Sequence, residues 1–304
     1  MEMKKISEMK KISELVYYIP NPTNIGVVKD GEKSVILIDT GLDDDTGKRV
    51  LKLLEENSLV PKVIINTHSH ADHCGGNRYI KEKTGAMIYA PEVESAIIQY
   101  PSLEPLYLFS GASPLKDLQN KFLMAQPSDV DYIIKKDERK LKFDEIELGI
   151  VPLPGHAPNQ IGIKADNVLF CADSLFSEDV LKKHKIPFFV DIDKTRETLR
   201  FLRDSQYKFY VPSHAEPRKS LIELVDTNLK VIDEVEKYLL DKFHGRKTTE
   251  QVLKDICDHY QITINGIQQY YLVNTVVMAY LSSLHGRGKL KVKVSDNTLF
   301  WDKI

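Results

Sequence analysis

Residues 66–76 read Asn-Thr-His-Ser-His-Ala-Asp-His-Cys-Gly-Gly, and they directly follow the apolar run Val63-Ile64-Ile65. Within this stretch, residues 68–73 contain three imidazoles and a carboxylate. A buried strand would expel so many polar groups, because an unpaired polar group is costly in apolar surroundings. The segment is therefore expected at a strand end, facing a ligand. Divalent cations such as zinc, iron or manganese suit its nitrogen and oxygen donors.

The spacing within this stretch indicates two metal positions. His68 and His70 alternate with a serine, so in an extended turn both side chains project to the same side and can hold one ion. The adjacent Asp72 and His73 supply donors for a second ion. The alternative is a solvated histidine-rich loop, which is disfavoured for so dense a cluster directly after an apolar strand.

Three later apolar runs each end at one residue of a metal-ligand type, namely His156, Asp173 and His214. Taken singly, each is explained equally well as a turn residue or a satisfied polar group. The strand ends along one edge of a layered α/β fold converge, however, so all three can meet the first cluster in space. Together they predict a single site.

The pattern His68-x-His70-x-Asp72-His73 resembles the signature of the metallo-β-lactamase superfamily, and Leu153-Pro154-Gly155-His156 resembles the third motif of that family. The resemblance covers about residues 16–240 and implies an α/β fold, the αββα sandwich. It implies one set of ligands for each of two metals and one bridging residue: His68, His70 and His156 for the first, Asp72, His73 and His214 for the second, and Asp173 between them. It also implies that Asp39 supports the site, although from the sequence alone Asp39 is equally a turn residue or a helix cap.

Departures from the family pattern bear on the subtype. Asn159-Gln160 stands where many thioesterase members carry Gly-His. His70 replaces the glutamate of the di-iron oxidoreductase branch, and Asp173 replaces the cysteine of the β-lactamases. What remains implied is hydrolysis by a hydroxide bridging two divalent metals, zinc first and iron or manganese as alternatives. Asp72 would bind a metal and also orient the nucleophile, which makes it the catalytic residue.

Three functions compete at this stage. Hydrolysis of an ester, thioester or lactone in a small-molecule substrate is favoured by the acidic pI and an aromatic cap. A phosphodiesterase or ribonuclease acting on RNA or DNA is the alternative, since relatives include RNases and the C-terminal hairpin is basic. A nucleic-acid-binding regulator with a structural metal comes third, because seven ligands exceed the four of a structural zinc site.

Composition places the chain among ordinary globular proteins. It has 304 residues, 42% of them hydrophobic, with a net charge of −2 and a pI near 6.5, so no global field attracts nucleic acid or an anionic membrane. Three cysteines without CxxC spacing fit a reducing compartment. No run approaches the roughly 20 apolar residues of a membrane span, so we expect a soluble, cytoplasmic protein without membrane contact. Residues 1–15, in which residues 2–7 are repeated as 8–13, are expected to form a polar extension.

The rest of the chain divides at about residue 240. Residues 16–240 are expected to form the catalytic domain, with an inserted cap at about 91–142 whose short helices cover the metal cleft; its aromatic residues are explained equally well by packing. His184 follows Asp173 in the chain and could border the substrate. The other histidines have no partner at ligand spacing and are expected to be ordinary residues: His244, His259 and His285.

Residues 241–304 are expected to form a small winged-helix-like domain. Thr248 and Gln251 suit a capping box at the first helix, residues 267–284 supply one or two more helices, and a hairpin follows. The hairpin region carries four cations, Arg287, Lys289, Lys291 and Lys293. The helices before it carry few, so packing or homodimerisation is favoured over nucleic-acid binding.

Overall fold

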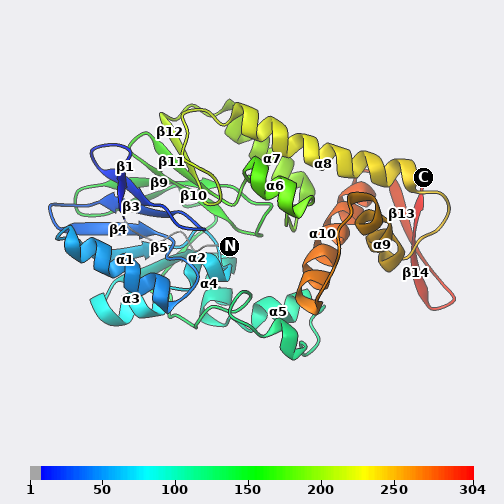
Figure 1. Cartoon of the computed structure of the whole chain (residues 1–304), viewed down its shortest axis with the longest axis horizontal. Coiled ribbons are helices and arrows are strands. Elements are labelled where there is room, and N and C mark those ends of the chain that lie inside the picture. Colours follow the sequence, from blue (N-terminus) through cyan, green and yellow to red (C-terminus); the bar gives the residue numbers. More distant parts are fainter. Residues whose placement is uncertain (1–7) are drawn as a thin grey trace.

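The computed structural model describes residues 8–304, so the first copy of the terminal repeat lies outside the described part. Two mixed sheets lie face to face, with helices on both outer faces (Figure 1). The first sheet has the order β1 (Lys10–Lys11), β2 (Val16–Ile19), β3 (Ile25–Lys29), β4 (Ser34–Ile38), β5 (Val60–Ile65), β6 (Met87–Pro91) and β7 (Tyr132–Ile134). The second has the order β12 (Phe209–Pro212), β11 (Val168–Ala172), β10 (Ile161–Ala165), β9 (Glu147–Pro152) and β8 (Lys140–Lys142).

Alternation along the central strands builds the layers. In β4, Ile36 and Ile38 face the core between the sheets, whereas Val35 and Leu37 face the helices α1 (Asp44–Glu56) and α3 (Asn77–Thr84). A strand covered on both faces reads as a continuous apolar run, as this one does. On the second sheet, the outer core lies under α6 (Glu178–His184), α7 (Ile192–Asp204) and α8 (Ile222–Lys242). The predicted αββα sandwich is confirmed.

The cap differs in part from the expectation. Its first half does consist of short helices, α4 (Glu92–Gln99), α5 (Leu103–Leu108) and the 3-10 helix η1 (Lys116–Leu118). Residues 132–142, however, supply strands β7 and β8, which pair with β6 and β9 at the sheet edges. The last part of the expected cap thus contributes to the two sheets, and three-residue strands carry too short a pattern to be recognised in the sequence. The name cap is used below for residues 92–131.

The C-terminal unit, residues 241–304, contains the predicted elements. Helix α9 (Thr249–Tyr260) begins with the Thr248–Gln251 capping box, one long helix α10 (Ile267–Gly286) follows, and β13 (Leu290–Ser295) pairs with β14 (Thr298–Lys303). Its core continues without a break into that of α7 and α8, from Leu199 and Val235 to Trp301. The helices and the hairpin are confirmed, whereas a winged-helix domain is not established by this arrangement.

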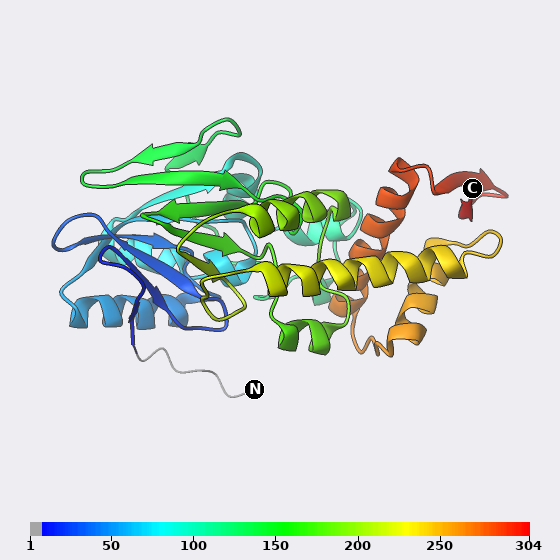
Figure 2. The ribbon, with the colours of Figure 1, turned by 90° about the horizontal axis from the view of Figure 1, so that it is seen from above.

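Helix α10 contacts two distant parts of the chain. Near its start, Gln268 accepts a hydrogen bond from Asn120 of the cap (3.0 Å), and the ring of Tyr271 lies 5.3 Å from that of Phe109. Near its end, Ser283 donates to Asp193 of α7 (2.9 Å). Figures 1 and 2 show α10 beside α5 at one end and near α8 and the hairpin at the other. The C-terminal unit therefore braces the cap.

Among residues 8–304, no helix has both the length and the apolar character needed to cross a membrane. The second copy of the terminal repeat contributes Lys10–Lys11, which pair antiparallel with Tyr17 and Tyr18 of β2.

Candidate metal centre

Four strand ends deliver the predicted ligands, and a fifth delivers the supporting Asp39, to one edge of the sandwich, here called the metal edge. The segment after β5 carries four of them, His68, His70, Asp72 and His73, and includes the short helix α2 (Ala71–Cys74). His156 follows β9, Asp173 follows β11, and His214 follows β12. Asp39 follows β4 with a left-handed φ of 62°.

Glycine is required where the chain turns into the site at residue 155. Gly155 has a φ of 133°, and a Cβ built there would come within 2.4 Å of the Thr195 hydroxyl oxygen. Only glycine combines that backbone conformation with so close a neighbour. The turn places the imidazole of His156 inside the site, where its Nε2 lies 2.9 Å from His70 Nδ1.

The seven predicted residues fall into three overlapping groups in which the potential ligand atoms lie within 4.8 Å of one another. The first group is His68, His70 and His156; the second is Asp72, His73 and His214; the third is His68, His73 and Asp173. These are the groups that the family resemblance implies, with Asp173 between them. The structure thus brings all seven side chains together, and their role as ligands remains a prediction.

Hydrogen bonds to the outer ring nitrogens set the tautomers of the histidines. The carbonyls of Phe188 and Pro22 accept from Nδ1 of His156 (2.8 Å) and of His214 (2.9 Å). Asp39 accepts from His73 Nδ1 (2.8 Å). Thr67 donates its own proton to Asp39 (2.8 Å), so its oxygen accepts from His68 Nδ1 (3.1 Å). In these four rings Nε2 is left facing the cluster.

The ring nitrogens and the carboxylate oxygen that face one another inside the site are too close, and too poorly hydrogen-bonded, to be satisfied without added positive charge. His70 Nδ1 lies 3.1 Å from His68 Nε2 and 2.9 Å from His156 Nε2, and three nitrogens at such distances can share only one proton. Beside them, His73 Nε2 and Asp173 Oδ1 are buried, and neither has a hydrogen-bond partner among residues 8–304. Nitrogen and carboxylate donors in this number and arrangement fit two divalent cations.

The pKa values of the histidines are shifted in opposite directions in the two halves of the site. Burial, followed by the neighbouring His156, lowers the pKa of His70 to about 3, so this ring stays neutral as a metal ligand must. Burial also lowers the pKa of His73, but Asp173, Asp72 and Asp39 outweigh it and raise that pKa well above the usual range. Three carboxylates thus favour a positive charge beside His73, and a bound cation would supply it with the ring neutral.

Three further residues touch this site and were not predicted from the sequence. Thr23 donates to Asp72 Oδ2 (2.6 Å). Glu104 of the cap is buried, and its Oε1 lies 3.8 Å from His70 Nε2. Glu94, also of the cap, accepts hydrogen bonds from Ser69 and Asn159. All three come from segments distant in the chain, and no local spacing distinguishes them.

The remaining histidines lie outside the three groups found among residues 8–304. His259 stacks on Tyr238 with ring centroids 3.9 Å apart, and His285 Nδ1 donates to the carbonyl of Leu290 (3.0 Å). His184 ends α6 near enough to His214 for that ring to contribute to the lowering of its pKa, which burial and Lys183 dominate. It remains a candidate to border the substrate.

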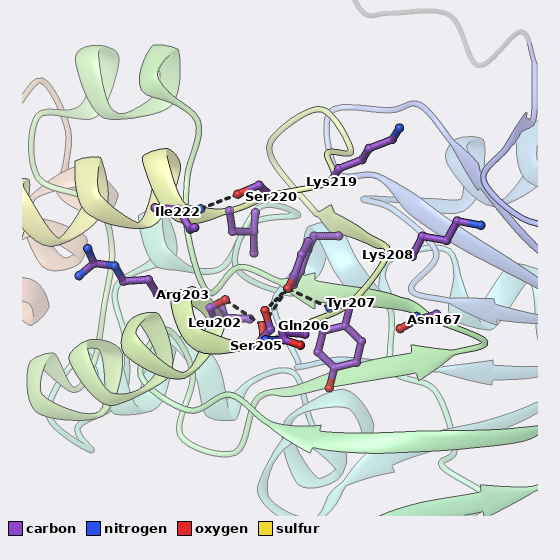
Figure 3. Close-up of a pocket in the computed structure, with 12 residues that line it drawn as sticks. Asn167, Leu202, Arg203, Ser205, Gln206, Tyr207, Lys208, Lys219, Ser220 and Ile222 are labelled. Atoms are coloured by element: carbon purple, nitrogen blue, oxygen red, sulfur yellow. Dashed lines mark hydrogen bonds between the residues drawn. The ribbon is translucent and has the colours of Figure 1, made fainter.

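Two cavities help to locate the mouth of the site. One, of about 570 Å³, opens beside His214, and its charged lining is mainly acidic: Glu178, Asp179, Glu216 and Glu223 against Arg218. Another, of about 400 Å³, lies beside Asn167 and Lys208, which precede β11 and β12 (Figure 3). It is therefore at the opposite strand ends from Asp173 and His214, away from the metal edge.

A layered sandwich with this donor set at one edge defines a class of metal-dependent hydrolases, and sequence comparison agrees. The profile of the Metallo-beta-lactamase superfamily matches residues 18–214, well over half of the chain. The chain belongs to this superfamily. Similar curated sequences include hydroxyacylglutathione hydrolase GloC of Haemophilus influenzae, 28% identical over 155 residues, and hydroxyacylglutathione hydrolase of Vibrio campbellii, 27% identical over 157 residues. These matches span 50% and 52% of this chain but only 66% and 48% of the relatives.

Solved structures share the fold over nearly the whole chain. A beta-lactamase domain protein from Burkholderia ambifaria superposes with a TM-score of 0.74 at 13% identity, covering 97% of this chain and 93% of its own. A metallo-beta-lactamase family protein from Thermus thermophilus gives 0.71 at 18% identity, covering 97% of both chains. The likeness therefore extends into the C-terminal unit.

Proposed function

We propose that this protein is a dinuclear metal-dependent hydrolase acting on an acyl bond, meaning an ester, thioester or lactone of a small molecule. The observation that carries the proposal is the set of ring and carboxylate atoms that face one another inside the site. Three imidazole nitrogens lie at hydrogen-bond distance, and His73 Nε2 lies 3.3 Å from Asp173 Oδ1, with no hydrogen bond to either atom among residues 8–304. Two bound cations would satisfy all of these buried atoms together.

His68, His70 and His156 would hold one ion, Asp72, His73 and His214 the other, and Asp173 would contact both. Zinc is the first candidate, with iron or manganese as alternatives. Such ions, when bound, supply a water of lowered pKa and polarise the bond to be cleaved.

The protein's own side chains orient this chemistry. Asp72 is the most exposed of the seven residues, with 36% of its side chain accessible, so its carboxylate lies where water enters. Thr23 donates to Asp72 Oδ2 and fixes the plane of that carboxylate. In this proposal Asp72 would accept a hydrogen bond from the attacking water and direct the water's lone pair at the acyl carbon.

Two observations favour an acyl bond over a phosphodiester. The curated relatives are named for hydrolysis of a hydroxyacylglutathione, an acyl compound. The cavity beside His214 carries four acidic side chains against one arginine, and such a lining repels a polyanionic backbone. A small acyl compound without several negative charges suits it better.

A substrate panel tests the proposal. Metal-replete protein is assayed on acyl-glutathione and acyl-coenzyme A thioesters, aryl esters, lactones, a bis-aryl phosphodiester and single-stranded RNA. We expect turnover of at least one acyl compound, abolished in His70→Ala and retained in His259→Ala. Turnover of RNA or the phosphodiester alone would replace the acyl proposal. A folded protein that binds less than one metal ion per chain would contradict the proposal of a dinuclear site.

We further propose that the C-terminal unit serves packing and not nucleic-acid binding. Arg287 contacts Glu236 and Asp193, and Lys291 lies 3.6 Å from Asp302, so half of the predicted basic group faces carboxylates of the chain itself. Nucleic-acid contacts would require these cations to be available to phosphates.

A further inference from the structure

Glu94 is a buried carboxylate for which the proposed reaction has no use. It lies in the first turn of α4, and its side chain is fully buried. Its Oε2 accepts from the backbone N–H of Ser69 (3.1 Å) and from the Ser69 hydroxyl (2.6 Å). Its Oε1 accepts from the backbone N–H of Asn159 (2.9 Å). Each carboxylate oxygen thus contacts a different loop.

The two loops come from different sheets and together build the first proposed metal position. Ser69 lies between His68 and His70, in the segment that follows β5 of the first sheet. Asn159 lies three residues after His156, in the turn between β9 and β10 of the second sheet. The 2.9 Å approach of His156 Nε2 to His70 Nδ1 therefore depends on how these loops are held together.

Apart from the approach of His156 to His70, the described residues of the two loops meet where Ile161 N–H donates to the carbonyl of Thr67 (3.0 Å). One backbone hydrogen bond leaves the loops free to rotate about it, whereas two separated attachments fix their mutual orientation. Glu94 supplies the second attachment. Asp39, by contrast, contacts Thr67 and His73, which belong to the same loop, so it does not set the distance between the loops.

Burying a carboxylate without a cation is costly, which argues on energetic grounds against an incidental role for Glu94. Burial raises the pKa of Glu94, and the bonds from Ser69 and Asn159 oppose that shift. A glutamine or an apolar side chain would fill the same volume at lower desolvation cost. What a carboxylate provides here is two strong acceptors, aimed at three donors on two loops.

We propose that Glu94 is a positioning residue that fixes the spacing of the two loops and so sets the geometry of the His68–His70–His156 metal position. This inference rests on the proposed metal site. It gives the cap a role in assembling that site, in addition to covering it. The helix that carries Glu94 is itself fixed, because Ile98 packs against Cys74 and Ala90 in a buried cluster.

The test compares Glu94→Gln with wild type and with Glu92→Gln, an exposed glutamate in the same first turn. The glutamine side chain keeps the volume but presents an NH₂ group to one of the two loops, whose N–H donors it cannot satisfy. Zinc affinity is measured by competition with a chromophoric chelator. Hydrogen exchange at the Ser69 and Asn159 amides is measured in metal-free protein.

We expect Glu94→Gln to weaken one of two zinc equivalents by about 10- to 100-fold, the usual effect of losing a residue that orients metal ligands. Exchange at both amides should be faster, and Glu92→Gln should match wild type. Ser69→Ala removes only the hydroxyl donor and should give a smaller loss; it serves as the deciding variant if Glu94→Gln does not fold.

Unchanged zinc affinities in Glu94→Gln, even with a lowered melting temperature, would reduce Glu94 to a fold-stabilising residue and overturn the inference. If wild type itself binds no zinc, iron or manganese, the metal site is wrong and the inference falls with it. The two failures are distinguished by the wild-type titration alone.

Discussion

At the metal edge, side chains from five strand ends meet within a few ångströms, whereas the C-terminal unit joins the protein through broad packing and a few ion pairs. The first region is set by topology: once the sheets form, the ligand-bearing ends lie side by side. The second is set by the complementarity of surfaces far apart in the chain, such as Gln268 with Asn120 and Ser283 with Asp193. A single substitution should therefore affect chemistry in the first region and stability in the second.

The largest effect is expected from Asp173→Asn at the metal edge. The substitution keeps the volume but removes the charge placed between His73 and His214, at 3.3 and 3.1 Å. We expect weaker metal occupancy and a fall in turnover of about two to three orders of magnitude, with the fold retained. Turnover on the best acyl substrate, metal content and circular dichroism measure this. Asp166→Asn, in the exposed turn between β10 and β11, is the control.

Near-wild-type turnover in Asp173→Asn at unchanged metal content would mean that Asp173 is a turn residue after all. Substitutions at the metal edge would then not differ from those in the C-terminal unit by their effect on turnover.

A smaller effect, on stability, is expected where the C-terminal unit meets the catalytic domain. Glu236 of α8 accepts from Arg196 of α7 (2.8 Å) and from both terminal nitrogens of Arg287 at the end of α10 (3.0 and 2.7 Å). Glu236→Gln should lower the free energy of unfolding by about 2 kcal/mol at pH 7, because charged hydrogen bonds in a half-buried setting are lost. Glu234→Gln, an exposed glutamate 3.8 Å from Lys230, is the control.

This loss should depend on pH with a defined sign. Burial raises the pKa of Glu236, but Arg287 and Arg196 outweigh it, so the folded-state pKa lies below the ordinary value of 4.5. A depressed pKa stabilises the fold above the unfolded-state value and loses that effect as pH falls through the folded-state value. The difference between wild type and Glu236→Gln should be constant from about pH 6 to 8 and shrink below about pH 4.5. Denaturant unfolding measures it; a difference that persists at pH 3 would show that the charge is not responsible.

The smallest effect is expected from reversing the hairpin charges. Lys291→Glu combined with Lys293→Glu should lower the free energy of unfolding by at most about 1 kcal/mol, since Lys293 is exposed and Lys291 loses only a surface ion pair with Asp302. It should leave turnover unchanged. Fluorescence anisotropy with RNA and duplex DNA at several salt concentrations is the measurement. Submicromolar, salt-sensitive binding by wild type that the double variant abolishes would assign the hairpin to nucleic acid and reject the packing role.

Sequence reasoning succeeded where position along the chain determines position in space. His156, Asp173 and His214 each follow an apolar strand, and strand ends of a layered fold must converge, so their meeting could be predicted without knowing the packing. The capping box at Thr248 and the hairpin turn at Asp296–Asn297, where both turn residues have positive φ, are likewise local features. The family itself was predicted from the spacing in residues 68–73 and is confirmed by the superfamily match.

It failed where a residue acts across the fold. Glu94 reads as a first-turn helix glutamate, the type usually found on the surface, and only the folded chain places it between two ligand loops. The edge strands β7 and β8 were assigned to the cap because three residues give no readable period. The winged-helix expectation used the order of elements alone, and the order does not say that α10 extends to the cap.

The bracing of the cap by α10 also has a consequence for how the protein is made. Every proposed metal ligand has been synthesised once the ribosome reaches His214, but Gln268, which meets the cap, lies 54 residues further on. At typical elongation rates this interval lasts about 3–11 s. During translation there is consequently a period in which the strand ends and their histidines exist while the cap still lacks its brace, and a metal ion arriving then meets a site more open than the finished one.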